Sequence, residues 1–306
     1  MDGYYVCRSP IFAKKLCRHE LYLCLFKIAF ILGQKYVISP RSAHVGAHLQ
    51  ELWQYRYLVA RFALRDYKVR FAQTALGYLW AILQPLATLG VLYFVFGKML
   101  AVKTESIPYF PFALSGLMYW SYFSLVTTQS AGGLIQSQPL IKKIYFPRLA
   151  IPFSKGLVGL VEFAVAFIIL VSMALYGDYL SVNALLMAPL LLLWSTLAAM
   201  GAGLWISAIS IRHRDVQQIL PFVLQFLFFL TPVAFPTAKL SSLLPQGSHW
   251  ITYLNPMMGL IDISRYFWFD ISPGTWWPLS LGVALLLFAS GLWAFQRIEK
   301  SMADLI

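Results

Sequence analysis

Charge is scarce in this chain, and negative charge is scarcest. Only 12% of its 306 residues are charged, and the 24 lysines and arginines outnumber the 12 aspartates and glutamates. Soluble domains carry roughly 25% charged residues, so the composition indicates lipid as the main solvent. The net charge of +12 does not predict a nucleic-acid partner, because the basic residues lie in short loops and in the N-terminal segment.

Motifs for catalysis and for nucleotide binding are also missing. No GxxxxGK[ST] phosphate loop, HExxH or GxSxG occurs in the sequence. The three cysteines fall within the first 24 residues and form neither a CxxC pair nor a metal-ligand spacing. We therefore predict a protein that is not an enzyme and holds no metal or cofactor of its own. Its energy would come from another polypeptide.

Long apolar runs take the place of these motifs. A membrane helix needs about 20 mostly apolar residues, and we predict an all-α integral membrane protein with six transmembrane helices per subunit. The six runs cover residues 77–100, 110–129, 149–176, 184–211, 219–236 and 276–295. We expect the fifth helix to stop at Thr231 and Pro232, because proline lacks a backbone N–H and clashes with the preceding turn.

The basic residues lie asymmetrically between these runs. If the N-terminus is cytoplasmic, 20 of the 24 lysines and arginines fall on the cytoplasmic side, which is the bias that the positive-inside rule describes. Both termini are therefore predicted to be cytoplasmic, with an even number of crossings between them.

Residues 49–76, just before the first run, carry too many charges to span a membrane. Charged side chains, among them Arg65, Asp66 and Arg70, alternate with an aliphatic and aromatic stripe. This pattern favours an amphipathic helix lying in the membrane interface over a solvated cytosolic helix. The basic extension before it, residues 1–48, is given no function.

Residues 237–275, between the fifth and sixth runs, are too apolar for a solvated loop, and prolines divide them into two short segments. Irregular backbone at membrane depth persists only where protein or a water-filled cavity covers it. We therefore predict a re-entrant helical hairpin at the outer side of the molecule.

The stretch LIKKIYFPRLAIP, residues 140–152, interrupts the apolar sequence between the second and third runs. A short helix at about 132–143, beginning at a glycine pair, would expose Leu140 and Ile141 on one face. Either a protein partner covers these side chains, or the helix rests on lipid headgroups while its lysines bind phosphates. The residues by themselves leave both interpretations open.

Glu162 is the sole acid in the middle of an apolar run. Acids within membrane helices are rare and often functional, so Glu162 is a candidate for binding substrate or a proton. Structural hydrogen bonding inside the bundle is an equally good explanation.

Aromatic side chains on the first two runs are candidates for lining a path for sugars, because the C–H faces of sugar rings stack on aromatic rings. Packing and lipid contact are the alternatives, since Trp and Tyr gather at both membrane interfaces. The candidates are Tyr93, Phe94, Tyr119, Trp120, Tyr122 and Phe123.

Five segments, in order along the chain, resemble the membrane subunit of bacterial ABC-2 type exporters of polysaccharides, the group that moves O-antigen, capsule and teichoic acid chains. These are LRDYKVRFAQTALGYLWAILQP (64–85), LIKKIYFPRLAIP (140–152), RHRD (212–215), TPVAFP with YLNPM (231–236 and 253–257) and Arg265, and FQRIEKSMADLI (295–306). The resemblance begins at about Leu52, so residues 1–48 have no counterpart in it.

The resemblance implies a homodimer of six-span subunits in the bacterial inner membrane. Two separate ABC ATPase subunits would bind ATP and Mg²⁺ beneath it and drive export of a lipid-linked polysaccharide of the O-antigen type. Membrane lipids would be the remaining partners. It also implies an ATPase-coupling segment made of Leu140, Ile141, Lys142, Lys143, Tyr145, Phe146 and Arg148.

An outer gate formed by Asn255, Pro256, Met257 and Arg265 is implied by the same resemblance. The interface helix would transmit the movement of the ATPase subunits to the first span.

Three other interpretations stay open. The cargo of an ABC-2 permease can also be teichoic acid, capsule, a drug or a lipid. A membrane-embedded glycosyl- or acyltransferase would need an acid cluster, to which Asp262 and Asp270 are the nearest approach. A passive channel would stay active without any ATPase.

Overall fold

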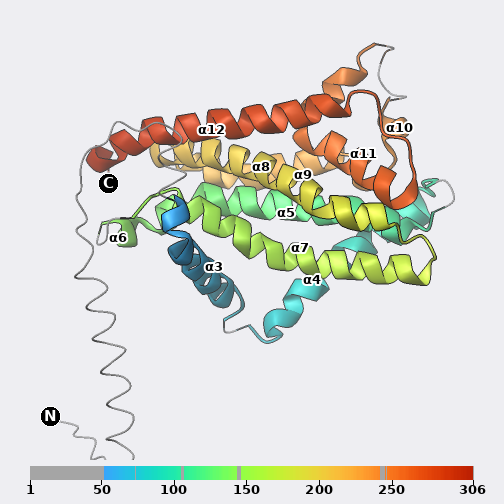
Figure 1. Cartoon of the computed structure of the whole chain (residues 1–306), viewed down its shortest axis with the longest axis horizontal. Coiled ribbons are helices and arrows are strands. Elements are labelled where there is room, and N and C mark those ends of the chain that lie inside the picture. Colours follow the sequence, from blue (N-terminus) through green and yellow to red (C-terminus); the bar gives the residue numbers. More distant parts are fainter. Residues whose placement is uncertain are drawn as a thin grey trace, which may run out of the picture. The chain divides into compact units, whose positions relative to one another are not determined.

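The computed structural model of this chain is built from helices (Figure 1). It describes residues 52–72, 74–104, 107–142, 146–241, 245 and 247–305. No β-strand occurs among these residues, so the predicted all-α class is confirmed. The basic extension predicted at residues 1–48 lies outside the described residues.

Four helical stretches in the described part of the chain are long and apolar enough to cross a membrane. They correspond to the first, third, fourth and sixth predicted runs. The first is continuous but changes its winding from the 3-10 turn η1 through the α-helix α4 to the π-helical η2. The bounds are η1 Gly77–Leu79, α4 Trp80–Leu92, η2 Tyr93–Met99, α7 Ala150–Tyr176, α8 Val182–Arg212 and α12 Trp277–Leu305.

The second and fifth predicted runs form helices that differ from these four. α5 (Tyr109–Gln136) has 28 residues, but serine, glycine and tyrosine make it less apolar. α9 (Asp215–Leu230) is apolar but has only 16 residues, and its C-cap is Thr231. The predicted end of this helix is therefore confirmed. The count of six spans stays a prediction.

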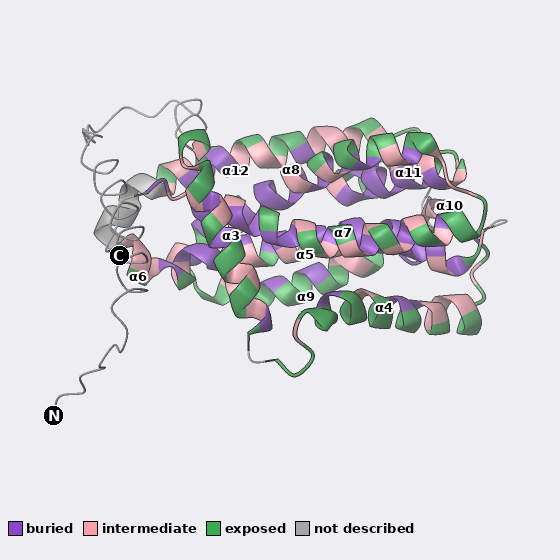
Figure 2. Ribbon diagram, turned by 60° about the horizontal axis from the view of Figure 1, so that its bottom comes forward, coloured by how far each residue is buried: buried purple, intermediate pink, exposed green. Residues whose placement is uncertain are grey.

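The centre of the bundle is α5, which packs against α4, α7, α8, α9 and α11. Most of its residues are buried, whereas α4 is exposed over much of its surface (Figure 2). A helix enclosed by other helices needs no apolar face toward solvent or lipid. The enclosure explains how α5 can be rich in polar and small residues.

Small residues allow α8 and α12 to pack closely. A Cβ atom added to Gly201 of α8 would lie 2.6 Å from the carbonyl carbon of Leu287, and one added to Gly291 of α12 would lie 2.6 Å from the Gly201 oxygen. Glycine at such contacts lets two membrane helices approach at backbone distance.

The amphipathic segment predicted at 49–76 contains a shorter helix, α3 (Arg56–Phe71), which packs against α7. Its buried face begins with Val59, Phe62 and Ala63. Other apolar side chains of this segment point away from the bundle: Trp53, Tyr57, Leu64 and Val69 are exposed. Apolar residues therefore lie on both sides of α3, and the predicted separation into two faces is incomplete.

The coupling helix predicted at 132–143 is not one helix. α5 continues through the glycine pair, the chain bends at Ser137, and a single turn, α6 (Gln138–Ile141), follows. Gly133 packs closely on α7, so the glycines belong to a helix contact and do not start a new helix. Pro139 lacks the N–H that would extend α5.

The outer segment contains α10 (Thr237–Ser241), the 3-10 turn η3 (His249–Leu254) and α11 (Pro256–Phe269). α11 is largely buried against α5, α8 and α12. Asn255 caps it, since its side chain accepts a hydrogen bond from the Met257 N–H at 3.0 Å, and Pro256 occupies the first helical position. The predicted hairpin stays a prediction.

Candidate functional site

A groove with a volume of about 520 Å³ is bordered by α4, α5 and α9, with one residue each from α3 and α7. α5 contributes Ser121, Ser124 and Thr128, which are spaced three and four residues apart and therefore share one face of the helix. α4 contributes Gln84 and Thr88, one helical turn apart. The groove thus presents polar side chains beside apolar ones such as Trp120 and Phe228.

Most of these polar groups are available to a ligand. Within the described residues, the side chains of Ser121, Ser124 and Thr128 make no hydrogen bond to protein, and neither does that of Gln225 on α9. The Thr88 hydroxyl donates to the Gln84 carbonyl of its own helix at 3.0 Å. Hydroxyls and amides without internal partners both donate and accept, so the groove suits a ligand rich in hydroxyl groups.

Two charged side chains lie at this groove and form an ion pair. Arg70 Nη1 of α3 lies 2.6 Å from Glu162 Oε1 of α7, and the two side chains are 27% and 18% exposed. Glu162 lines the groove and is held by an ion pair, and its binding of a substrate or a proton stays a prediction. Sequence reasoning missed its partner because Arg70 lies on a distant segment that only the fold brings near.

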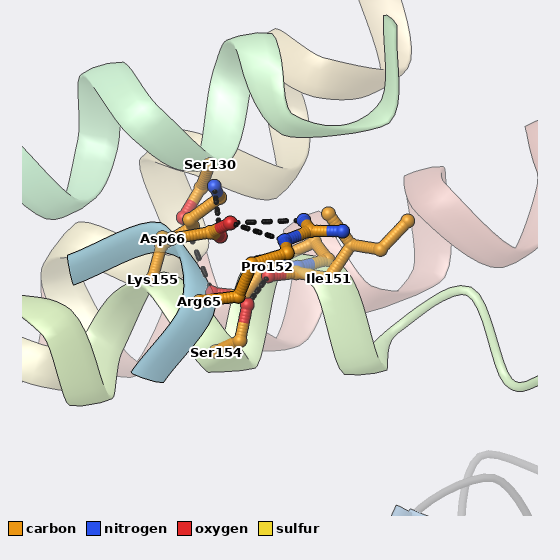
Figure 3. A network of polar contacts seen from close by, with 7 residues as sticks. All are labelled: Arg65, Asp66, Ser130, Ile151, Pro152, Ser154 and Lys155. Atoms are coloured by element: carbon orange, nitrogen blue, oxygen red, sulfur yellow. Dashed lines mark hydrogen bonds and ion pairs between the residues drawn. The ribbon is translucent and has the colours of Figure 1, made fainter. Parts of the chain in front are cut away.

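A second ion-pair cluster lies one turn earlier on α3 (Figure 3). Lys155 Nζ of α7 donates to Asp66 Oδ2 at 2.6 Å, while Arg65 donates from Nε and Nη2 to Asp66 Oδ1 at 3.0 and 2.8 Å. Lys155 is only 6% exposed. The charged residues predicted for an interface helix, Arg65, Asp66 and Arg70, therefore help to fasten α3 to α7.

An apolar cluster continues this contact toward the start of α7. The ring of Phe62 on α3 packs edge-on against that of Phe146, with centroids 5.4 Å apart. Leu140 and Ile141 of α6 are partly buried and pack against the same cluster, to which Leu149 also belongs. α3, α6 and the start of α7 are thus joined in one packed unit.

The predicted ATPase-coupling residues are therefore unequally accessible. Phe146 is buried, Arg148 is half-buried, and Leu140 and Ile141 are partly covered by their own chain. Lys142 is exposed. Lys143 and Tyr145 lie outside the described residues. The coupling role of the segment stays a prediction.

Only one of the six aromatic candidates lines the 520 Å³ groove. Trp120 lies there, and its ring packs against Phe228 of α9. Tyr122 lines a smaller cavity of about 50 Å³, which shares Glu162 with the groove. Its hydroxyl also lies 2.9 Å from that of Thr196 on α8.

The other four aromatic candidates are placed elsewhere. Tyr119 is fully buried and packs on Phe163, while the buried ring of Phe123 packs on Trp120. Tyr93 packs on Phe110, and Phe94 is 60% exposed on the outside of the bundle. The hydroxyls and amides of the groove were not among the predicted candidates. Their signal in the sequence was the serine and threonine spacing within the second run.

Comparison with known proteins settles the family. The profile of the ABC-2 type transporter family matches residues 57–269, more than two thirds of the chain. The chain belongs to this family. The resemblance found in the sequence is thereby confirmed, and an ABC-2 transporter chain with several apolar helices is a membrane protein.

Relatives of this ABC-2 transporter chain include the O-antigen export system permease protein RfbA of Klebsiella pneumoniae, 26% identical over 247 residues, which cover 79% of this chain and 92% of the relative. The protein of the same name from Myxococcus xanthus is 28% identical over 257 residues, covering 82% and 96%. The polysialic acid transport protein KpsM of Escherichia coli is 29% identical over 251 residues, covering 78% and 92%.

Two of the four residues predicted as an outer gate of this ABC-2 chain, Asn255 and Arg265, bind the segment 231–236, and the gate role itself stays a prediction. Arg265 of α11 is 2% exposed, donates to the Val233 carbonyl at 2.8 Å and the Phe235 carbonyl at 3.2 Å, and stacks 3.8 Å from the Phe112 ring centre. Asn255 donates to the Thr231 hydroxyl at 2.7 Å, and Met257 is fully buried. These contacts satisfy carbonyls that lack helical partners.

The two aspartates considered for a transferase, Asp262 and Asp270, line a second cavity of about 240 Å³ beside Arg265. Both carboxylate oxygens of Asp262 are engaged, one by the Tyr253 hydroxyl at 2.6 Å and one by that of Thr237. Burial and the Asp262 carboxylate raise the pKa of Tyr253, so its hydroxyl stays a donor. Within the described residues no cluster suited to a metal ion occurs.

Proposed function

We propose that this chain is the permease subunit of an ATP-driven exporter that moves a lipid-linked polysaccharide across the bacterial inner membrane. The relatives named for O-antigen export and polysialic acid transport support a polysaccharide cargo. The observation that carries the proposal is the groove, in which unpartnered hydroxyls and amides lie beside Trp120. The hydroxyls of a glycan can bond to these hydroxyls and amides, and the C–H faces of its sugar rings can stack on the Trp120 ring.

The proposed arrangement in the membrane has six spans, with α5 and α9 added to the four apolar stretches. The enclosure of α5 by apolar helices supports its position as a span. α3 would lie at the cytoplasmic interface, where its exposed Tyr57 and the exposed Trp53 just before it meet the headgroup region. η3 and α11 would form the re-entrant outer segment, and both termini would be cytoplasmic.

Two copies of the chain and two ABC ATPase subunits would make up the transporter. The outward face of α9, which borders the groove, is strongly apolar, and Phe222 and Phe226 are 74% and 67% exposed. A second copy packed there would cover these side chains and close the groove. The ATPase subunits, which would hold ATP and Mg²⁺, would dock near α6 and Lys142.

The direct test is ATP turnover by the permease purified with its cognate ATPase. Turnover should rise when a lipid-linked polysaccharide is added, and Trp120→Ala should reduce that rise while the ATPase stays bound. Trp293→Ala is the matched control, because Trp293 is exposed on α12 and does not line the groove. A rise with drugs or simple lipids but none with polysaccharide would contradict the proposal. Passage of glycan without the ATPase would favour a channel.

A further inference from the structure

One positively charged side chain lines the groove, and it is already paired with a carboxylate. Among the described residues that line the groove, Arg70 and Glu162 alone carry charge, and they lie 2.6 Å apart. Their charges therefore cancel at the surface that a ligand would meet. The other polar groups of the lining are hydroxyls and amides.

The position of Arg70 is fixed by its helix. One turn earlier on α3, Asp66 is bonded to Lys155 of α7, so α3 is held against α7 next to the Arg70–Glu162 pair. The Asp66–Lys155 pair comes before the Arg70–Glu162 pair along α3, and also along α7. Arg70 therefore meets Glu162 as part of a built contact, and a ligand that approaches the guanidinium also meets the Glu162 carboxylate.

An acidic polysaccharide needs a counter-charge that this groove does not offer. The hydroxyls and amides can donate hydrogen bonds to a carboxylate, but they carry no charge to offset that of a carboxylate that leaves water. The guanidinium of Arg70 is committed to Glu162, and a second carboxylate beside Glu162 would be repelled by it. A neutral glycan loses no ionic hydration and finds partners in Ser121, Ser124 and Gln225.

We propose that this groove selects an uncharged polysaccharide over a polyanionic one, and that Glu162 sets the selection by occupying Arg70. The inference rests on the proposed function, because it names the class of polysaccharide carried at the same site. The names of the relatives do not decide between the two classes, since polysialic acid is a polyanion and the name O-antigen states no charge.

The first experiment compares two probes on the permease–ATPase complex in lipid nanodiscs. One probe is a neutral lipid-linked polymannose and the other is polysialic acid of matched length on the same lipid anchor. The neutral polymer should raise ATP turnover at a concentration at least several-fold below that needed for the acidic polymer. Equal or stronger stimulation by polysialic acid would overturn the charge selection and leave the polysaccharide export proposal standing. If neither polymer stimulates ATP turnover, both the charge selection and the polysaccharide export proposal would be overturned.

Glu162→Gln tests the residue itself. It frees the Arg70 guanidinium, so the half-saturating concentration of polysialic acid should fall by up to about fivefold, the upper end of what one partly exposed ion pair supplies. The neutral polymer should respond much as before. Asp178→Asn is the matched control, since it removes one carboxylate from an exposed loop beyond α7. An unchanged response to polysialic acid in Glu162→Gln would contradict the assignment.

The exchange variant Arg70→Glu with Glu162→Arg protects the test against loss of folding. It restores an ion pair in which the acid lies on α3 and the base on α7, so it should keep the preference for the neutral polymer. Arg70→Met alone removes the pair and should weaken the packing of α3 on α7. Loss of the preference in a folded exchange variant would show that charge pairing does not set the selection.

Discussion

At the scale of the residue, Lys155 depends on Asp66. The lysine is 6% exposed and donates to Asp66 at 2.6 Å. Asp66→Ala would leave a buried ammonium without a counter-charge, which costs about 3–5 kcal/mol when one member of a buried pair is removed. We expect a clear decrease in the melting temperature of the purified permease, measured by thermal unfolding in detergent.

The double variant Asp66→Ala with Lys155→Met provides the control for this loss. It removes both charges and keeps an apolar chain of similar length, so most of the lost stability should return. A double variant that is as unstable as Asp66→Ala would mean that the aspartate acts through Arg65 or through packing.

Arg265 supports a second residue-scale prediction. Its two hydrogen bonds hold the Val233 and Phe235 carbonyls, and Arg265→Met would leave both without a donor. Each unsatisfied buried group costs about 1–3 kcal/mol, so the variant should unfold at lower temperature. Protease cleavage within 231–245 should also become faster. Normal stability together with lost export would instead identify Arg265 as a transport residue.

Sequence patterns identified the unusual charges but not their pairing. Glu162 stood out because an acid in an apolar run is rare, and Asp66 was named with Arg65 and Arg70 among the charges of the segment 49–76. Ion pairs between helices depend on crossing geometry, which local sequence patterns do not reveal. Lys155 was counted as a basic residue at the cytoplasmic side, and nothing nearby in the sequence indicated its burial.

At the scale of the element, the α8–α12 contact depends on the absence of side chains. Gly201→Val would place a Cβ atom 2.6 Å from the main chain of α12, so the helices must separate. We expect a large loss of thermal stability and of monodispersity in size-exclusion chromatography. Gly282→Val on α12 is the control, because a Cβ atom there meets nothing within 4 Å. Similar losses in both variants would argue against the close contact.

The coupling segment gives the second prediction at this scale. Leu140 and Ile141 are partly buried in the α3–α7 cluster, so their replacement by Asp would disturb the permease as well as any docking. Lys142→Glu is sharper, because Lys142 is exposed. It should weaken co-purification of the ATPase at least several-fold without changing the melting temperature. Retained binding would remove Lys142 from the docking surface.

Element boundaries were predictable where local chemistry decides them. α9 stops at Thr231 because Pro232 follows, and α11 starts at Pro256 with Asn255 as its cap. The prediction of one helix at 132–143 was wrong, because α5 continues through the glycine pair and Gly133 serves a contact with α7. The polar face of α5 was not predicted, because the candidates in the second run were chosen among its aromatic residues.

At the scale of the whole molecule, the distribution of Lys and Arg predicts which ends of the helices share a compartment. Ser272 lies beyond α11 on the proposed outer side and Lys142 follows α6 on the proposed cytoplasmic side, and both are exposed. A cysteine at either site reports its compartment, once Cys7, Cys17 and Cys24 are replaced by serine.

In right-side-out membrane vesicles, an impermeant maleimide should label Ser272→Cys at once and Lys142→Cys only after the membrane is opened. The reason is electrostatic: moving the 20 basic residues of one side across the bilayer would oppose both their hydration and the membrane potential. Labelling of Lys142→Cys alone in sealed vesicles would mean that the chain has the opposite orientation in the membrane. Labelling of both would place an even number of crossings between them, so that α7, α8 and α9 could not all span the membrane as proposed.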